Sequence, residues 1–95
     1  MAILISAHVP ACDTNSQGDV IRKVILEALD TNEIIELDFQ GIPNVTSSFV
    51  NSAFIELLPI VDIAAIKSRI RITRVNRQIG SMINARFKSE TRAGV

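Results

Sequence analysis

The sequence predicts a small two-layer α/β domain with the element order βαβαβα and a parallel or mixed sheet. Short stretches in which apolar and polar residues alternate, as in strands, are separated by longer stretches with apolar residues at helical spacing. A sheet covered on both faces would instead read as continuous apolar runs. We therefore expect the helices mainly on one face of the sheet, and a second, polar face that is solvated or used for assembly.

Length and composition indicate one globular domain. The chain has 95 residues, of which 47% are hydrophobic and 21% are charged, which suits a single modest core. One cysteine excludes an intrachain disulfide, and no apolar run reaches the roughly 20 residues of a membrane span. No secretory signal pattern is present at the N-terminus. We expect a cytoplasmic domain over residues 1–95, with a strand and loop at 1–16 and a frayed tail at 90–95.

Three stretches alternate like strands, at residues 2–9, 33–39 and 69–75. In each of them most of the apolar residues fall on one face. If the second and third strands are neighbours, Glu36 lies near Arg69 or Arg71. The polar face would carry Glu36, Asp38, Arg69 and Arg71.

Helical spacing of apolar residues predicts the intervening helices. The first covers residues 17–30, and Ser16 with Asp19 resembles an acidic capping box at its start. The second begins at Ser47, is interrupted by Pro59 and continues for one or two turns over residues 60–67. Asn76 is expected to cap the last helix.

Charge divides the chain into two halves. Residues 1–62 hold nine acidic and two basic residues, whereas residues 63–95 hold eight basic residues and one acid. This asymmetry either guides a charged partner or is neutralised within the fold. A nucleic acid is one such partner, although the four Phe, without Trp or Tyr, offer little stacking surface. The basic contact surface would comprise Arg69, Arg71, Arg74 and Arg77.

The sequence offers little for catalysis. His8 is the only histidine and is expected on the polar face, away from the serine-rich segment, so a Ser–His nucleophile is not expected. His8 and Cys12 lack further ligands at zinc spacing, and no glycine-rich phosphate loop is present. Cys12 is expected to be an inert loop thiol. We expect a non-enzymatic protein without metal or cofactor.

The segment after the second strand carries the strongest local signal. A Gly/Pro/Asn loop leads to Thr46, Ser47 and Ser48, where a helix begins. Backbone N–H groups lack intrahelical partners at a helix start and the helix dipole is positive there. These hydroxyls therefore act either as plain caps or as a site for a phosphate or an acidic partner group. The candidate binding residues are Asn44, Thr46, Ser47, Ser48 and Phe49.

Residues 34–39, followed by Thr46-Ser47-Ser48-Phe49 and Ala53-Phe54, resemble the STAS-like domain family of unknown function over residues 17–87. That family is similar to the STAS domains of bacterial anti-sigma-factor antagonists. In those proteins a histidine-kinase-like ATPase phosphorylates the first serine of an Asp-Ser-Ser-Gly motif at a helix start. The resemblance implies Ser47 as the phosphoacceptor and Ser48 as the second hydroxyl, with Thr46 in place of Asp and Phe49 in place of Gly.

The resemblance implies a regulatory protein-interaction module in which a phosphoserine switch controls the binding of a protein partner, such as a histidine-kinase-like ATPase or another serine kinase. In the unmodified chain we expect Ser47 to cap its helix. Two alternatives remain open. One is a nucleic-acid-binding protein that uses the basic C-terminal half. The other is a structural interaction subunit, for example a homodimer, without any modification.

Overall fold

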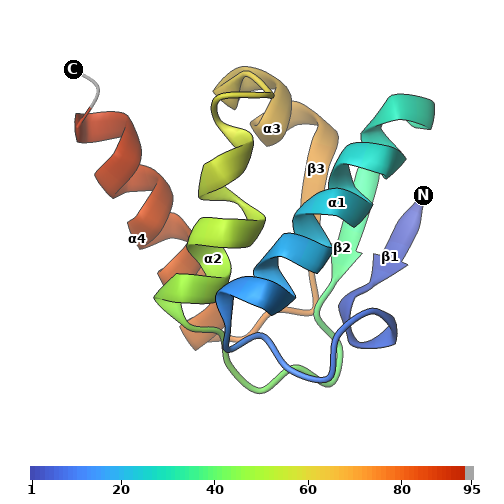
Figure 1. Ribbon diagram of the computed structural model, residues 1–95, viewed down its shortest axis with the longest axis vertical. Helices are drawn as coiled ribbons and strands as arrows, with labels where there is room; N and C mark the ends of the chain where they lie inside the picture. The colour runs from blue at the N-terminus through green and yellow to red at the C-terminus, as the bar shows by residue number, and fades with distance from the viewer. Residues whose placement is uncertain (94–95) are drawn as a thin grey trace.

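The structure is a computed structural model that describes residues 1–93 of the chain, with side chains placed for residues 1–90. One helix lies between its first two strands, two helices lie between the second and third, and one follows the third (Figure 1). Short 3-10 turns, labelled η, follow the first strand and the second helix. The elements are β1 (Ala2–Leu4), η1 (Ile5–Ala7), α1 (Asn15–Thr31), β2 (Ile35–Asp38), α2 (Ser47–Ala53), η2 (Ile55–Leu57), α3 (Ile63–Arg69), β3 (Ile70–Thr73) and α4 (Arg77–Ala93).

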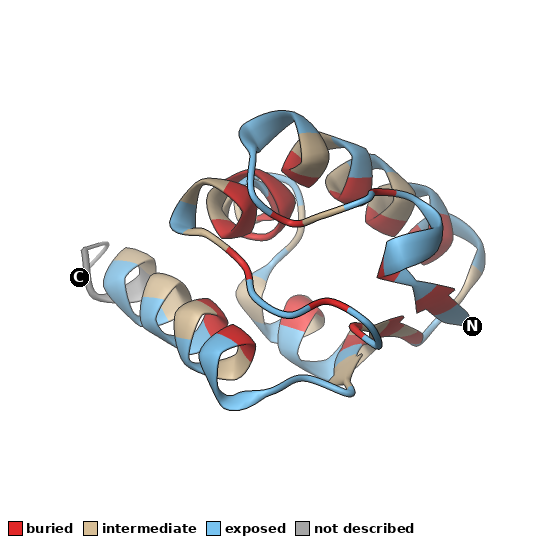
Figure 2. Cartoon of the chain, turned by 90° about the horizontal axis from the view of Figure 1, so that it is seen from below, coloured by how far each residue is buried: buried red, intermediate tan, exposed pale blue. Residues whose placement is uncertain are grey.

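The three strands form one sheet in the order β1-β2-β3, and both neighbouring pairs are parallel. Right-handed crossovers that step in one direction across a sheet place their helices on the same face. Helices α1 and α2 accordingly lie together on one face of the sheet, while α4 lies on the other side of α2 from α1 (Figures 1 and 2). The predicted two-layer α/β fold is confirmed, and the sheet is parallel throughout.

The two faces of the sheet differ as predicted. Ile35 and Leu37 of β2 are completely buried beneath the helices, whereas Glu36 and Asp38 are half-buried on the opposite face. In the β2–β3 register Glu36 lies opposite Arg71, and Arg74 Nε lies 3.7 Å from a carboxylate oxygen of Asp38. The charge asymmetry of the sequence is therefore partly neutralised within the fold.

Arg69 does not lie on the polar face, and that prediction is wrong. It is the last residue of α3, and its guanidinium reaches the end of α1. There it donates hydrogen bonds to the carbonyl oxygens of Leu29, Asn32 and Glu33 at 2.8, 2.9 and 2.8 Å. Because the carbonyls at a helix end lack intrahelical donors and carry the negative end of the dipole, a cation stabilises them. Arg69 thus joins α3 to α1.

The first strand is shorter than the predicted residues 2–9. Leu4 is its last residue and pairs with Asp38, where β2 also ends. Beyond that point the chain has no neighbouring strand, and it turns into η1. Ile5 and Val9 nevertheless remain buried, so the alternation reflects core contacts rather than strand length.

Helix α1 begins two residues earlier than predicted, because Thr14 caps it instead of Ser16. The Thr14 side chain accepts a hydrogen bond from the backbone N–H of Gln17 at 3.1 Å. Gln17 Oε1 in turn accepts from the backbone N–H of Thr14 at 3.1 Å. This reciprocal pair is a capping box with Gln rather than an acid at its third helical position.

The later boundaries also shift. After Pro59 the chain turns, and α3 begins at Ile63 rather than at residue 60. Asn76 caps α4 as predicted, with its Oδ1 accepting from the N–H of Ile79 at 2.9 Å. Helix α4 includes Glu90 and reaches Ala93, and residues 94–95 of the expected frayed tail lie outside the described residues.

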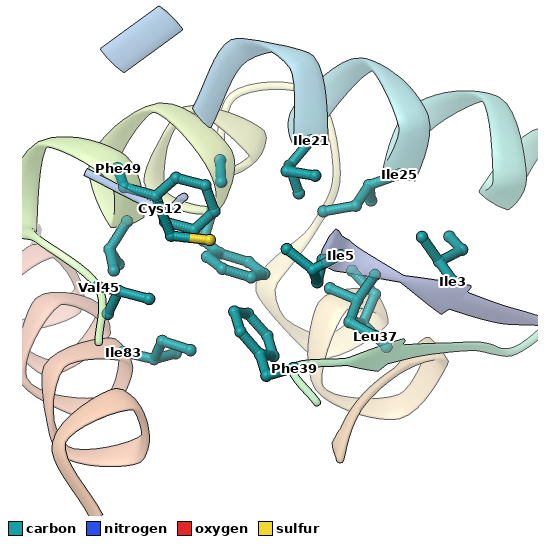
Figure 3. Packing of buried hydrophobic residues seen from close by; sticks show 14 of the residues in the cluster. Ile3, Ile5, Cys12, Ile21, Ile25, Leu37, Phe39, Val45, Phe49 and Ile83 are labelled. Carbon is teal, nitrogen blue, oxygen red and sulfur yellow. The ribbon is translucent and has the colours of Figure 1, made fainter. Parts of the chain in front are cut away.

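Buried side chains from the sheet and the helices form one hydrophobic core (Figure 3). Phe39, the residue that follows β2, and Phe49 of α2 are among its largest members. Cys12 is 1% exposed, so it belongs to this core although it lies in a loop. Burial, with a smaller contribution from Asp13, raises the pKa of the Cys12 thiol from 9.0 to about 12.

The raised pKa predicts a pH-dependent stability. Below pH 9 the thiol is protonated in both states, so its contribution to folding is complete. As the pH rises from 9 towards 12 the unfolded chain ionises first, and stability falls. Above pH 9 the wild type should lose about 1.4 kcal/mol of unfolding free energy per pH unit more than Cys12→Ala. Urea unfolding at several pH values measures this difference, and parallel pH profiles would contradict it.

Candidate functional site

The loop between β2 and α2 is held in place by the start of α4. The side-chain amide of Gln78 accepts from the N–H of Val45 at 3.0 Å and donates to its carbonyl at 2.9 Å. Asn76 Nδ2 donates to the carbonyl of Pro43 at 2.7 Å. Gly41 turns the loop with φ of 84°, a conformation that favours glycine. Asn44 is exposed within this fixed loop.

Thr46 is the cap of α2. Its side-chain oxygen accepts a hydrogen bond from the N–H of Phe49 at 3.2 Å. The same hydroxyl donates to the carbonyl of Asp13 at 2.8 Å, and the Thr46 N–H donates to the carbonyl of Cys12 at 3.1 Å. Both the hydroxyl and the N–H of Thr46 are therefore used in hydrogen bonds within the fold, and they connect the start of α2 to the loop before α1.

Ser47 is the first residue of α2 and is exposed. Its hydroxyl makes no hydrogen bond within the described part of the chain. The prediction that Ser47 itself caps the helix is wrong, because Thr46 takes that role. Ser48 is half-buried, and its carbonyl accepts from Asn15 Nδ2 at 3.3 Å.

Helix α2 is anchored from beneath and from the side. Phe49 is 0% exposed and points into the core, so it supports the site and offers no surface to a partner (Figure 3). Ser52 is the one buried polar residue of the described chain, and its Oγ accepts from Asn15 Nδ2 at 2.8 Å. The exposed part of the candidate site is therefore Asn44 and Ser47, with Ser48 partly accessible.

The division of roles between Thr46 and Ser47 gives a direct prediction. Thr46→Ala should lower the unfolding free energy by about 1–2 kcal/mol, because the N–H of Phe49 loses its acceptor. Ser47→Ala should change it by less than about 0.5 kcal/mol, as expected for an exposed residue without partners. Urea unfolding of both variants tests this. Equal losses would show that Ser47 shares the capping role.

The four arginines of the predicted basic surface have different surroundings. Arg69 is used inside the fold, as described above. Arg74 has φ of 54°, hydrogen-bonds to Gln40 and lies 3.7 Å from Asp38. Arg71 and Arg77 are exposed and make no hydrogen bond or ion pair with other described residues. The structure thus does not keep the four as one free cationic surface.

His8 and Cys12 are separated by environment, with His8 exposed at the end of η1 and Cys12 buried. Within residues 1–93 no group of three or more His, Cys, Asp or Glu side chains is placed to hold a metal ion. None of the described helices has the length and apolar character needed to cross a membrane.

Sequence reasoning missed Gln78, and it assigned the capping role to Ser47 instead of Thr46. Gln78 is exposed in a helix and its sequence context gives no sign that it contacts a loop 33 positions earlier. Thr46 could have been recognised as the cap, because it precedes by three positions the buried Phe49 whose N–H it binds. The antagonist motif points instead to the adjacent Ser47.

Comparison with known protein families gives one match. The model of the STAS-like domain of unknown function matches residues 17–79, which contain most of α1, all of β2, α2, α3 and β3, and the start of α4. No curated protein and no solved structure was found to match. The matched segment includes the β2–loop–α2 region and about two thirds of the chain. The chain therefore belongs to the STAS-like domain family of unknown function.

Proposed function

We propose that this chain is a non-enzymatic, cytoplasmic protein-interaction module whose partner binding is switched by phosphate on Ser47. The observation that carries the proposal is the free, exposed hydroxyl of Ser47 beside a helix cap supplied by Thr46. Because another residue caps the helix, Ser47 can be modified without removing a contact that the fold needs.

The chemistry of phosphorylation suits this position. A phosphate adds about −1.5 to −2 charges, and at the first position of a helix it meets the positive end of the dipole. The fold should therefore tolerate the modification. The exposed surface around Asn44 and Ser47 changes instead, from small and neutral to bulky and charged. A partner that packs closely there would be released.

The partner that this proposal names is a histidine-kinase-like ATPase. Support comes from family membership and from the similarity of the β2–loop–α2 segment to the motif of the anti-sigma-factor antagonists. This chain differs from that motif at two positions, with Thr46 in place of Asp and Phe49 in place of Gly, and each of these residues has a structural role. Thr46 supplies the cap oxygen that an Asp would supply, and Phe49 fills the core beneath the helix.

A binding experiment with charge variants tests the switch. The chain is titrated by calorimetry with a purified histidine-kinase-like ATPase of the class that phosphorylates anti-sigma-factor antagonists. Ser47→Ala should bind like the wild type, and Ser47→Asp at least tenfold more weakly. Ser89→Asp, which adds the same charge at an exposed site on α4, is the matched control and should bind normally. Wild-type affinity in Ser47→Asp, or no complex with the wild type, would defeat the proposal.

A further inference from the structure

A groove of about 200 Å³ lies between α3, β3 and α4. Its walls are mainly apolar, with Ile66 of α3, Ile72 of β3 and Ile83 of α4 contributing from the three elements. The rings of Phe54 and Phe87, whose centroids lie 6.3 Å apart, complete the lining. This groove is separate from the start of α2, since it contains none of the residues of the candidate site.

The groove includes an unpaired strand edge. β3 is an outer strand of the sheet, and within residues 1–93 no strand lies beyond it. The carbonyl of Thr73 accepts from the N–H of Phe39 at 3.0 Å, so the backbone of Thr73 faces β2. Because successive residues of a strand direct their backbone groups to opposite sides, the N–H and carbonyl of Ile72 face away from β2. They are available to a further strand.

Lys67 and Arg71 place two positive charges at this edge, and Glu36 of β2 lies beside Arg71 on the open face, where it accepts a hydrogen bond from Thr73. Arg71 projects onto the open face of the sheet, is exposed, and makes no ion pair or hydrogen bond with other described residues. Lys67 is exposed at the groove and is likewise unpaired there. A strand added beside β3 would direct alternate side chains into the groove and the others towards Arg71. The two environments match apolar and acidic side chains, respectively.

We propose that the edge of β3 binds an extended segment of a partner protein in which apolar and acidic residues alternate, as a fourth strand of the sheet. Backbone hydrogen bonds to Ile72 supply affinity, and the apolar side chains in the groove with the acidic ones beside Arg71 supply specificity. At the opposite edge, β1, the cleft beside α1 includes Glu27 and no Lys or Arg, and the hollow on the open face includes Glu36 as well as Arg71. An acidic segment is therefore directed to β3.

A peptide titration tests this proposal on the full chain. The probe is an acetylated, amidated hexapeptide of alternating Glu and Val, added to ¹⁵N-labelled protein. We expect saturable NMR shifts in β3 and in the α4 residues at the groove, and at least tenfold slower hydrogen exchange of the Ile72 amide. A peptide with Lys in place of Glu should bind at least tenfold more weakly. Two further peptides are N-methylated, one at every Val and the other at every Glu, so each lacks the N–H donors along one of its two edges. The peptide that lacks the donors facing Ile72 should not bind.

Surface variants connect the binding to Arg71. Arg71→Glu should weaken the peptide at least tenfold, whereas Arg77→Glu, an equal charge change at an exposed residue outside the groove, should weaken it less than threefold. Ser47→Asp should leave it unchanged, which separates this site from the phosphate switch. Spectra of the free variants confirm folding. Absence of saturable shifts, shifts centred on β1, or full binding by both N-methylated peptides would overturn the proposal.

Discussion

Replacing Phe49 with alanine should destabilise the protein more than any other change considered for this chain. The Phe49 side chain is 0% exposed and lies in the core between α2 and the sheet. Its removal leaves a cavity, and truncating a buried phenylalanine lowers the unfolding free energy by about 3–5 kcal/mol. Small domains have about 5–15 kcal/mol in total, so a large fraction of stability is lost. Urea unfolding of the purified variant measures this.

The matched control for Phe49→Ala is Ile60→Ala. Ile60 is also a large apolar residue, but it is 63% exposed. Its truncation should change the unfolding free energy by less than about 0.5 kcal/mol. A loss below about 1 kcal/mol in Phe49→Ala would contradict the role of Phe49 as the anchor of α2. It would also reopen the alternative in which this ring is offered to a partner.

Gly18→Ala should give the second large effect. A Cβ at Gly18 would lie 2.6 Å from the Cβ of Ser52 and 2.7 Å from the backbone carbonyl oxygen of Phe49. Because a backbone atom of α2 cannot rotate away as a flexible side chain can, α1 and α2 must separate. Overpacking of this kind lowers the unfolding free energy by about 1–3 kcal/mol or more. That loss should exceed the gain of about 1 kcal/mol that alanine brings to a helix.

Gly80→Ala is a control of opposite expected sign. Gly80 is also helical, in α4, but a Cβ there would meet nothing within 4 Å. Its replacement should therefore raise the unfolding free energy by up to about 1 kcal/mol. Thermal unfolding of the two variants compares them directly. If Gly18→Ala also stabilised the chain, the close approach of α1 and α2 would not be a constraint on the fold.

The fold class could be predicted because the buried face of each element repeats along the sequence. Ile35, Leu37 and Phe39 alternate in the sequence and are all buried in the structure. The same applies to Ile79 and Ile83 of α4, one helical turn apart. These patterns follow from the local geometry of a strand or a helix, so they can be recognised without knowing which segments pack against each other.

The residues whose positions or roles were predicted wrongly are determined by contacts between distant segments. Arg69 continues an alternating pattern, but its guanidinium binds carbonyls about 36 to 40 positions earlier in the chain. Leu4 ends β1 because its neighbour β2 ends opposite it. Thr46 is held by the loop at Cys12 and Asp13, which the local motif does not reveal. Each outcome depends on which segments become neighbours in space.

Phosphate mapping tests the central claim, the free Ser47 hydroxyl at the start of α2, most directly. The wild type, Ser47→Ala and Thr46→Ala are incubated with the same histidine-kinase-like ATPase and ATP, and modified peptides are identified by mass spectrometry. We predict one phosphate per chain on Ser47 in the wild type and none in Ser47→Ala, with Ser47 still modified in Thr46→Ala. Phosphate on another residue, or none on the wild type, would contradict the proposed switch.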